Sequence, residues 1–200
     1  MKYVGFHKVK INSDGTVSKE YPQIYFDFNA VAKGFGIDCL GRYLESKGVT
    51  DYLIELGGEI LTKGENLDKN QKWVVGIEAV DSELEDRSYE ATITLKNEGM
   101  ASSGNYRKFR IDSLTGKKYV HTLNPLSGSA EMSDITSSTV IAPTCAVADA
   151  YATSFMALGM KKSRQLLKSL PNVEAYLTFN DSLNNHQVFM TEGFKKRLGN

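Results

Sequence analysis

The sequence predicts an α+β fold in which helices pack on a mixed, largely antiparallel sheet, as a single domain over residues 1–200. Strand-like segments outnumber helical ones, and several follow one another at hairpin spacing. Strands and helices that do not alternate regularly favour this class over a purely parallel sheet. The chain has 200 residues and an apolar fraction of 41%, which is enough to form one buried core.

Two segments have the periodicity of helices. Residues 31–47 carry their apolar side chains on one face, and residues 144–158 form the second helix. Gly48 and Gly159 follow them as stop signals. A shorter third helix is expected before Pro171.

Strands are expected where apolar and polar residues alternate or where β-branched residues gather. These segments are residues 3–11, 23–27, 51–56, 73–80, 89–95, 137–142, 173–179 and 186–194, with a further strand that runs into a turn within residues 119–128.

Composition and motifs exclude several classes of function. The formal net charge is zero, with 24 basic and 24 acidic residues, so nothing indicates a nucleic-acid-binding surface. No stretch reaches the ~20 apolar residues of a membrane span. No dinucleotide-binding glycine motif, P-loop, nucleophile elbow or zinc motif occurs. Cys39 and Cys145 lie in helical patterns and are interpreted as small buried side chains rather than a disulfide or a metal pair.

The helix at residues 144–158 carries the clearest chemical pattern. Asp149 and Thr153 are four residues apart and therefore share a face, among small alanines. A carboxylate and a hydroxyl with space around them suit a hard cation such as Mg²⁺. The pattern alone is also compatible with a structural Asp–Thr pair, and the residues do not decide between the two.

Three further stretches are suggestive but have ordinary alternatives. Gly57 and Gly58 after an apolar strand permit a close approach to a ligand, or a plain hairpin turn. The small-residue loop at 101–109 can donate to phosphates, or be a simple turn. His121 ends a strand before an Asn-Pro turn, where a histidine is either catalytic or structural.

Taken in order, these blocks resemble one family. "DFNAVAKGFGID", "ELGGEI", "SSGNYRKF", "YVHTLNPLSG" and "TVIAPTCAVADAYATSFMALG" are similar to the ApbE family of FAD:protein FMN transferases, over roughly residues 24–160. The resemblance implies an α+β fold that holds FAD in a cleft. It also implies a Mg²⁺-dependent reaction that cleaves FAD, attaches FMN through a phosphoester to a Ser or Thr of a partner protein, and releases AMP.

The resemblance also implies roles for individual residues. Gly34 and Gly36 would let the cofactor and the chain approach closely. The residues expected to bind FAD are Asp27, Lys33, Ser103, Gly104, His121 and Leu123. The expected Mg²⁺ ligands are the side chains of Asp149 and Thr153 and the backbone carbonyls of Ala30 and Ala152, with Asp149 also the catalytic residue.

The resemblance further predicts the partner and the location. The acceptor would be a redox-pump subunit or similar flavoprotein with the motif D-x-x-[ST]-G-[AS]-[ST], and by family habit the protein would be exported, periplasmic or membrane-anchored. "DSLTGKK", from Asp112, fits that motif only as far as Gly116, so the chain is not expected to modify itself. The chain is expected to be short at its N-terminus relative to the family. The alternatives are an FAD pyrophosphatase that yields FMN and AMP, and a non-catalytic flavin-binding domain.

Overall fold

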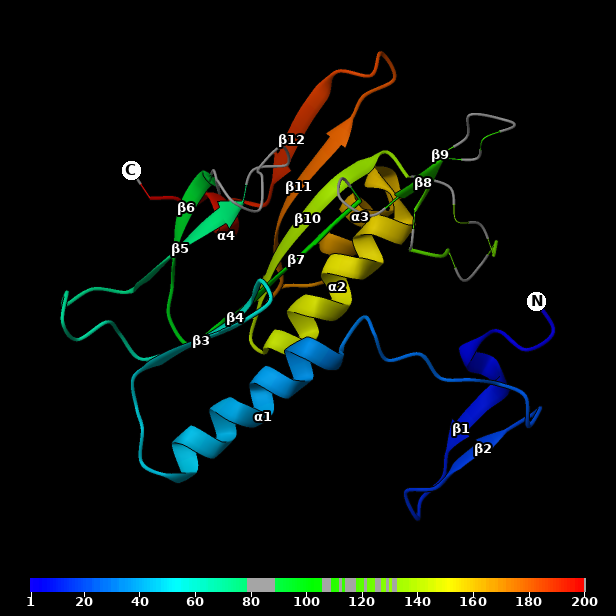
Figure 1. Cartoon of the computed structure of the whole chain (residues 1–200), viewed down its shortest axis with the longest axis horizontal. Helices are drawn as coiled ribbons and strands as arrows, with labels where there is room; N and C mark the ends of the chain where they lie inside the picture. Colours follow the sequence, from blue (N-terminus) through cyan, green and yellow to red (C-terminus); the bar gives the residue numbers. More distant parts are fainter. Residues whose placement is uncertain are drawn as a thin grey trace.

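The computed structural model describes residues 1–78, 89–105, 109–111, 113, 118–120, 122–124, 127, 128, 130 and 133–199. At its centre is a six-stranded sheet of order β12-β11-β10-β7-β4-β3, and every neighbouring pair is antiparallel (Figure 1). Its strands are β3 (Tyr52–Leu56), β4 (Glu59–Lys63), β7 (Gly99–Gly104), β10 (Ile135–Ala142), β11 (Glu174–Asn180) and β12 (His186–Met190).

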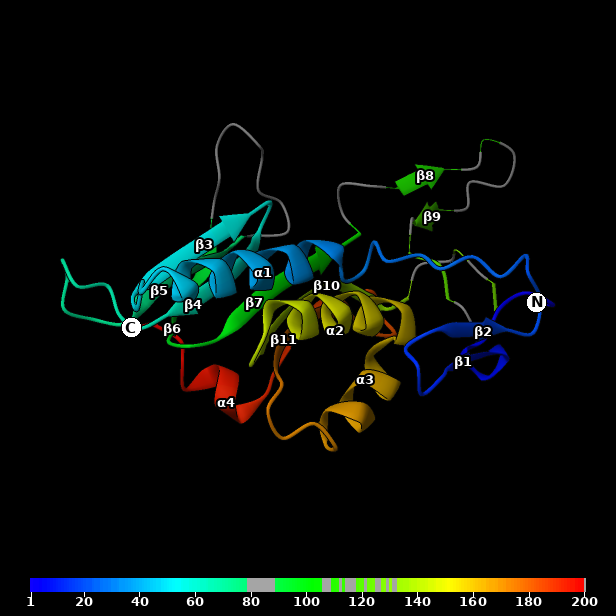
Figure 2. The same ribbon diagram turned by 90° about the horizontal axis from the view of Figure 1, so that it is seen from below.

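Two helices, α1 (Ala32–Ser46) and α2 (Cys145–Leu158), lie side by side on one face of this sheet (Figure 2). The short helix α3 (Met160–Leu167) follows α2 directly. Ala148 and Ala152 of α2 are fully buried with Ala101 of β7 and Val140 of β10. The small alanine side chains therefore let α2 pack closely on the central strands.

The opposite face of the sheet is covered by a second layer. It consists of a hairpin of β5 (Trp73–Glu78) and β6 (Tyr89–Leu95), together with the C-terminal helix α4 (Glu192–Lys195). Ile93 and Phe194 are fully buried there with Met100 of β7. Met100 and Ala101 are successive residues of one strand, so their side chains enter the two different cores.

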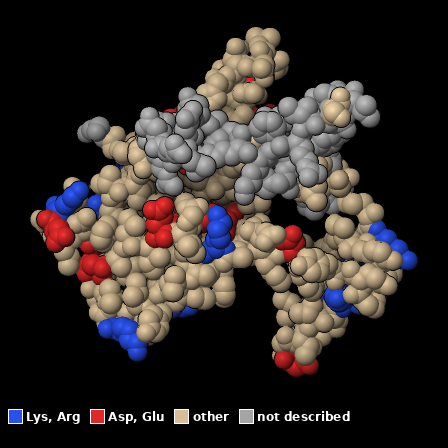
Figure 3. Space-filling view, in the orientation of Figure 1, with Lys and Arg blue, Asp and Glu red and all other residues tan. Residues whose placement is uncertain are grey.

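The remaining elements lie outside this three-layer body. The N-terminal segment consists of η1 (Phe6–Lys8), β1 (Val9–Ile11) and β2 (Val17–Lys19), and its hairpin stands apart from the sheet in Figure 1. A small hairpin pairs β8 (Phe109–Ile111) with β9 (Lys118–Val120). On the face shown in Figure 3, acidic and basic side chains of the described residues are interspersed. Among the described residues, no helix has both the length and the apolar character needed to cross a bilayer.

The predicted fold class is confirmed, and both long helices begin and end within about one residue of their predicted ends. Other details were wrong. Residues 23–27 form no strand, and Ser102, Ser103 and Gly104 belong to strand β7 rather than to a loop, because β10 pairs with them. Cys145 is buried as expected, whereas Cys39 is exposed, so that part of the interpretation was wrong.

The N-terminus of α2 is held by a side chain of α1. The Asp38 carboxylate accepts hydrogen bonds from the backbone N–H groups of Cys145 and Ala146, each at 2.9 Å. The Thr144 hydroxyl accepts the next one, from Val147, at 3.3 Å. The first N–H groups of a helix have no partner inside it, and an acidic group beside them also meets the positive end of the helix dipole. Asp38 therefore fixes α1 to the start of α2.

This contact requires glycine at Gly34. A Cβ atom placed there would lie 2.4 Å from the carbonyl oxygen of Cys145 and 2.8 Å from the Cα of Ala146. A Cβ atom at Gly36 would meet nothing within 4 Å. Gly34 thus permits the close approach of two helices, while the approach of a cofactor that the family resemblance implied stays a prediction.

We predict opposite effects for two matched substitutions in α1. Gly34→Ala should destabilise the protein by about 1–3 kcal/mol or more, because its Cβ meets the backbone of α2. Gly36→Ala should stabilise it by ~1 kcal/mol, because alanine favours a helix and the space is open. Denaturant unfolding measures both values, and equal effects of the two substitutions would contradict this packing.

The two cysteines should differ in reactivity. Burial raises the pKa of the Cys145 thiol to about 12, and the negative charges of Asp38, Glu59 and Asp149 add to this effect. Only the thiolate reacts readily. A thiol reagent at mildly alkaline pH should therefore modify Cys39 alone in the native protein, and both cysteines after unfolding. Peptide mass mapping measures this, and rapid native labelling of Cys145 would be the contrary result.

Candidate functional site

The candidate site centres on Asp149 in the second turn of α2. Its side chain is buried, with the residue only 4% exposed, and its Oδ2 accepts a hydrogen bond from the backbone N–H of Gly34 at 3.0 Å. Gly34 lies in the first turn of α1, where the N–H groups have no partner inside the helix. Asp149 of α2 therefore holds the N-terminus of α1, just as Asp38 of α1 holds the N-terminus of α2.

Burial disfavours the ionised form of the Asp149 carboxyl group. Loss of solvation raises the pKa of its carboxyl group, while the hydrogen bond from Gly34 and the positive charge of Lys33 act in the opposite direction. A raised pKa means that the folded environment disfavours the ionised form. A cation bound beside this carboxylate would remove that disadvantage.

Thr153 lies one turn further along α2, on the same face as Asp149. Its hydroxyl shares a hydrogen bond of 3.2 Å with the hydroxyl of Ser103, which comes from β7. Ser103 and Gly104 end that strand, and both are partly buried. The structure thus brings Ser103 beside Thr153, although fifty residues separate them in the sequence.

Lys33 forms an ion pair with Glu59, a residue that the sequence analysis did not place in the site. Its ammonium lies 2.5 Å from Oε2 of Glu59, the first residue of β4. The Glu59 side chain is 2% exposed and that of Lys33 is 50% exposed. Burial, and then the negative charge of Asp149, raise the pKa of Glu59, and Lys33 opposes both effects. The available signal was an acid directly after Gly-Gly within an apolar stretch.

Gly57 and Gly58 form the two-residue turn between β3 and β4, both with positive φ. This confirms the hairpin alternative. A Cβ atom at Gly57 would lie 4.0 Å from both Oε2 of Glu59 and Cδ of Lys33, so the turn lies against the ion pair.

The other predicted residues lie in varied settings. Asp27 is exposed, and its Oδ1 accepts a hydrogen bond of 2.8 Å from the backbone N–H of Asn29. Ala30 is partly buried in the turn before α1, Ala152 is fully buried inside α2, and Leu123 is exposed. His121 lies outside the described residues. Among the described residues, Asp27 forms no hydrogen bond with Asp149. The roles of Asp27 and Leu123 in binding FAD stay predictions.

The donor set around Asp149 fits a hard cation. Within the described part of the chain, no three His, Cys, Asp or Glu side chains gather as a metal cluster. A metal at Asp149 would therefore be held by one carboxylate, the Thr153 hydroxyl and backbone carbonyls. Such an all-oxygen set suits Mg²⁺, which keeps several of its ligands for water and substrate phosphates.

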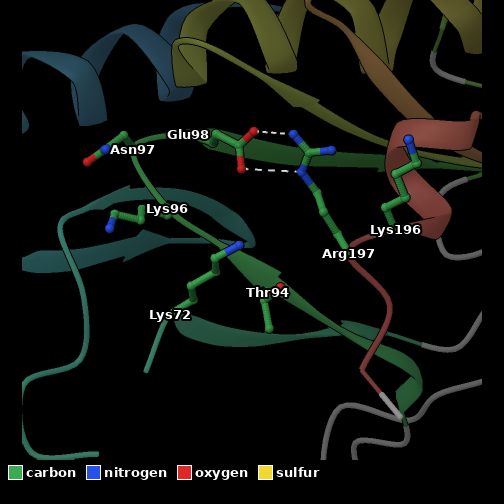
Figure 4. A pocket seen from close by; sticks show the side chains of 7 residues that line it. All are labelled: Lys72, Thr94, Lys96, Asn97, Glu98, Lys196 and Arg197. Atoms are coloured by element: carbon green, nitrogen blue, oxygen red, sulfur yellow. Dashed lines mark hydrogen bonds and ion pairs between the residues drawn. The ribbon is translucent and has the colours of Figure 1, made fainter. Parts of the chain in front are cut away.

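A separate cavity of about 410 Å³ lies between the second-layer hairpin and the C-terminal segment (Figure 4). It is lined by Lys72, Thr94, Lys96, Asn97, Glu98, Lys196 and Arg197. The Arg197 guanidinium is already bonded to the Glu98 carboxylate and to the Gly193 carbonyl. The three lysines are exposed, and none of the residues around Asp149 lines this cavity.

Known proteins share this arrangement of sequence and fold. The profile of the ApbE family matches residues 1–177. The FAD:protein FMN transferase of Haemophilus influenzae is 36% identical over 178 residues, which is 88% of this chain and 50% of that protein. The enzyme of the same name from Vibrio cholerae is 35% identical over 74% of this chain and 42% of its own length. The chain thus spans about half the length of these relatives.

Solved structures agree with these matches. The flavin transferase ApbE from Vibrio cholerae superposes with a TM-score of 0.81 at 28% identity, covering 98% of this chain and 60% of that one. The ApbE protein of Thermotoga maritima has a TM-score of 0.83 over all of this chain and 62% of its own, and at 22% identity it supports the fold alone. On the sequence match and the shared fold together, the chain belongs to the ApbE family.

Proposed function

We propose that this chain carries out the FAD-cleaving chemistry of a Mg²⁺-dependent FAD:protein FMN transferase. The single observation that carries the proposal is the buried Asp149 carboxylate, which lies on the same helical face as Thr153 and next to the N-terminus of α1. The names of the relatives, FAD:protein FMN transferases, support the same reaction.

In the proposed reaction, a Ser or Thr hydroxyl oxygen of the acceptor protein attacks the FMN phosphorus of FAD. The bond from that phosphorus to the AMP oxygen breaks, the hydroxyl proton is released, and AMP leaves. Mg²⁺, when bound, supplies the positive charge that neutralises the pyrophosphate oxygens. Catalysis by the chain itself is then mainly positioning and electrostatics.

Each residue has a proposed part in this scheme. The Asp149 carboxylate and the Thr153 hydroxyl would hold Mg²⁺, with the carbonyls of Ala30 and Ala152 as backbone ligands. The hydrogen bond from Gly34 orients Asp149. FAD would be bound by Asp27, Lys33, Ser103, Gly104, His121 and Leu123.

The acceptor and the location are also proposals. We propose a flavoprotein with the motif D-x-x-[ST]-G-[AS]-[ST], such as a redox-pump subunit, in an exported or membrane-anchored setting. The family resemblance supports both. In this motif the acceptor hydroxyl is followed by a glycine, which is conformationally permissive and has no side chain beside the hydroxyl.

We predict that the transfer depends on Asp149 and on a divalent metal. The chain, FAD, Mg²⁺ and an acceptor domain are mixed, and AMP release and the mass of the acceptor are followed. The acceptor should gain the mass of FMN, and EDTA should abolish the gain. Asp149→Asn keeps an oxygen for the Gly34 N–H and should fold normally, yet lose activity by at least about 100-fold, because the metal loses its only charged protein ligand.

A matched pair in α2 controls for non-specific damage. Thr153→Val removes the hydroxyl proposed to hold Mg²⁺ and should lower activity by about 10-fold or more. Ser154→Ala removes the neighbouring hydroxyl, which donates to the Ala150 carbonyl and, among the described residues, has no other hydrogen-bond partner, and this change should leave activity unchanged. AMP and free FMN without a labelled acceptor would favour the pyrophosphatase. Full activity in EDTA would contradict the proposal.

A further inference from the structure

We infer that Glu59 is a positioning residue, which holds the Lys33 ammonium in place for the anionic part of the nucleotide substrate. This inference rests on the proposed function, and it assigns a role to a residue outside the predicted site. The two side chains come from different elements, because Lys33 is in the first turn of α1 and Glu59 begins β4.

The geometry of the pair is asymmetric. The carboxylate of Glu59 is almost fully buried, while half of the Lys33 side chain is exposed, with 2.5 Å between the ammonium and the carboxylate. The carboxylate is therefore the fixed member, and the lysine reaches it from the protein surface. The Gly57–Gly58 turn lies against the pair and fixes the start of β4.

A buried carboxylate needs a partner, and within the described residues Lys33 is the only cation paired with Glu59. A free lysine side chain on the surface samples many rotamers, and ordering it costs part of the binding free energy of a ligand. Because Glu59 already orders the Lys33 side chain, binding of the ligand does not have to order it. Lys33 is next to Gly34, whose N–H is bonded to Asp149, and its positive charge acts on the Asp149 carboxyl group, so the ammonium lies within electrostatic range of the proposed metal ligand.

The neighbourhood contains further charges that act on this pair. The negative charge of Asp149 raises the pKa of Glu59, and the positive charge of Lys33 lowers that of Asp149. Replacing Glu59 by the isosteric glutamine would keep the volume of the side chain but remove the negative charge that holds the Lys33 ammonium. We therefore expect a loss of substrate affinity without a loss of the fold.

The test uses three variants of the whole chain: Glu59→Gln, Lys33→Met and the double variant. Thermal unfolding is measured first. Lys33→Met leaves the buried carboxylate without a partner and should lower Tm. The double variant removes both charges and should recover most of that loss, which shows that the two residues act as a pair.

The second readout is one that a purely structural pair would not change. The dissociation constant for FAD is measured from flavin fluorescence, and KM and kcat from AMP release. Glu59→Gln should weaken FAD binding and raise KM about 5- to 10-fold, with kcat changed less than about 2-fold, because only ordering of the lysine is lost. The double variant should bind FAD no more weakly than Lys33→Met, since Glu59 acts through Lys33.

A matched control is available elsewhere in the chain. Lys96 and Glu65 form an exposed ion pair of 2.7 Å, away from Asp149. Glu65→Gln should change neither Tm nor FAD affinity measurably. Riboflavin, which lacks phosphates, should bind the wild type and Glu59→Gln equally well.

The outcomes separate this inference from the proposed function. Unchanged or tighter FAD binding by Glu59→Gln, with weaker binding by Lys33→Met, would overturn the role of Glu59 and leave the transferase intact. A wild type that binds FAD but releases no AMP would overturn the transferase, while the FAD dissociation constants would still decide the role of Glu59. A wild type that binds no FAD would overturn both.

Discussion

The site depends on a reciprocal contact between the N-termini of α1 and α2. Asp149 of α2 accepts a hydrogen bond from Gly34 of α1, and Asp38 of α1 accepts hydrogen bonds from Cys145 and Ala146 of α2. Each buried carboxylate satisfies N–H groups that its partner helix leaves free, and each meets the positive end of a helix dipole. The contact fixes the two helices to each other, and with them the position of Lys33.

The buried carboxylates beside this contact are each compensated by a nearby partner. Burial raises the pKa of both Asp149 and Glu59, so the fold disfavours their ionised forms. In the described structure, Asp149 is compensated by a backbone N–H and Glu59 by the Lys33 ammonium. Sites that must bind a cation or an anion commonly keep such charged groups at a cost in stability. Such a cost agrees with the ligand-binding role that we propose for these side chains.

Local patterns in the sequence predicted the parts of the fold that are determined locally. Periodicity gave both long helices, and the four-residue spacing placed Asp149 and Thr153 on one face. Pairing across the chain was not predictable in this way. Asp38 is 107 residues from Cys145, so no local pattern links them, and the role of Gly34 followed only once α2 was seen against it. The Ser102–Gly104 segment resembled a loop because its residues are small, but pairing with β10 makes it a strand.

The most direct test of this account is a crystal structure of the chain with FAD and Mn²⁺, which replaces Mg²⁺ and gives an anomalous signal. The account predicts an anomalous peak in contact with the Asp149 carboxylate and the Thr153 hydroxyl, next to the pyrophosphate of FAD, with Gly34 still bonded to Asp149. A nucleotide bound with the metal elsewhere, or with Asp149 turned away from it, would contradict the central claim that the contact between α1 and α2 builds the metal site.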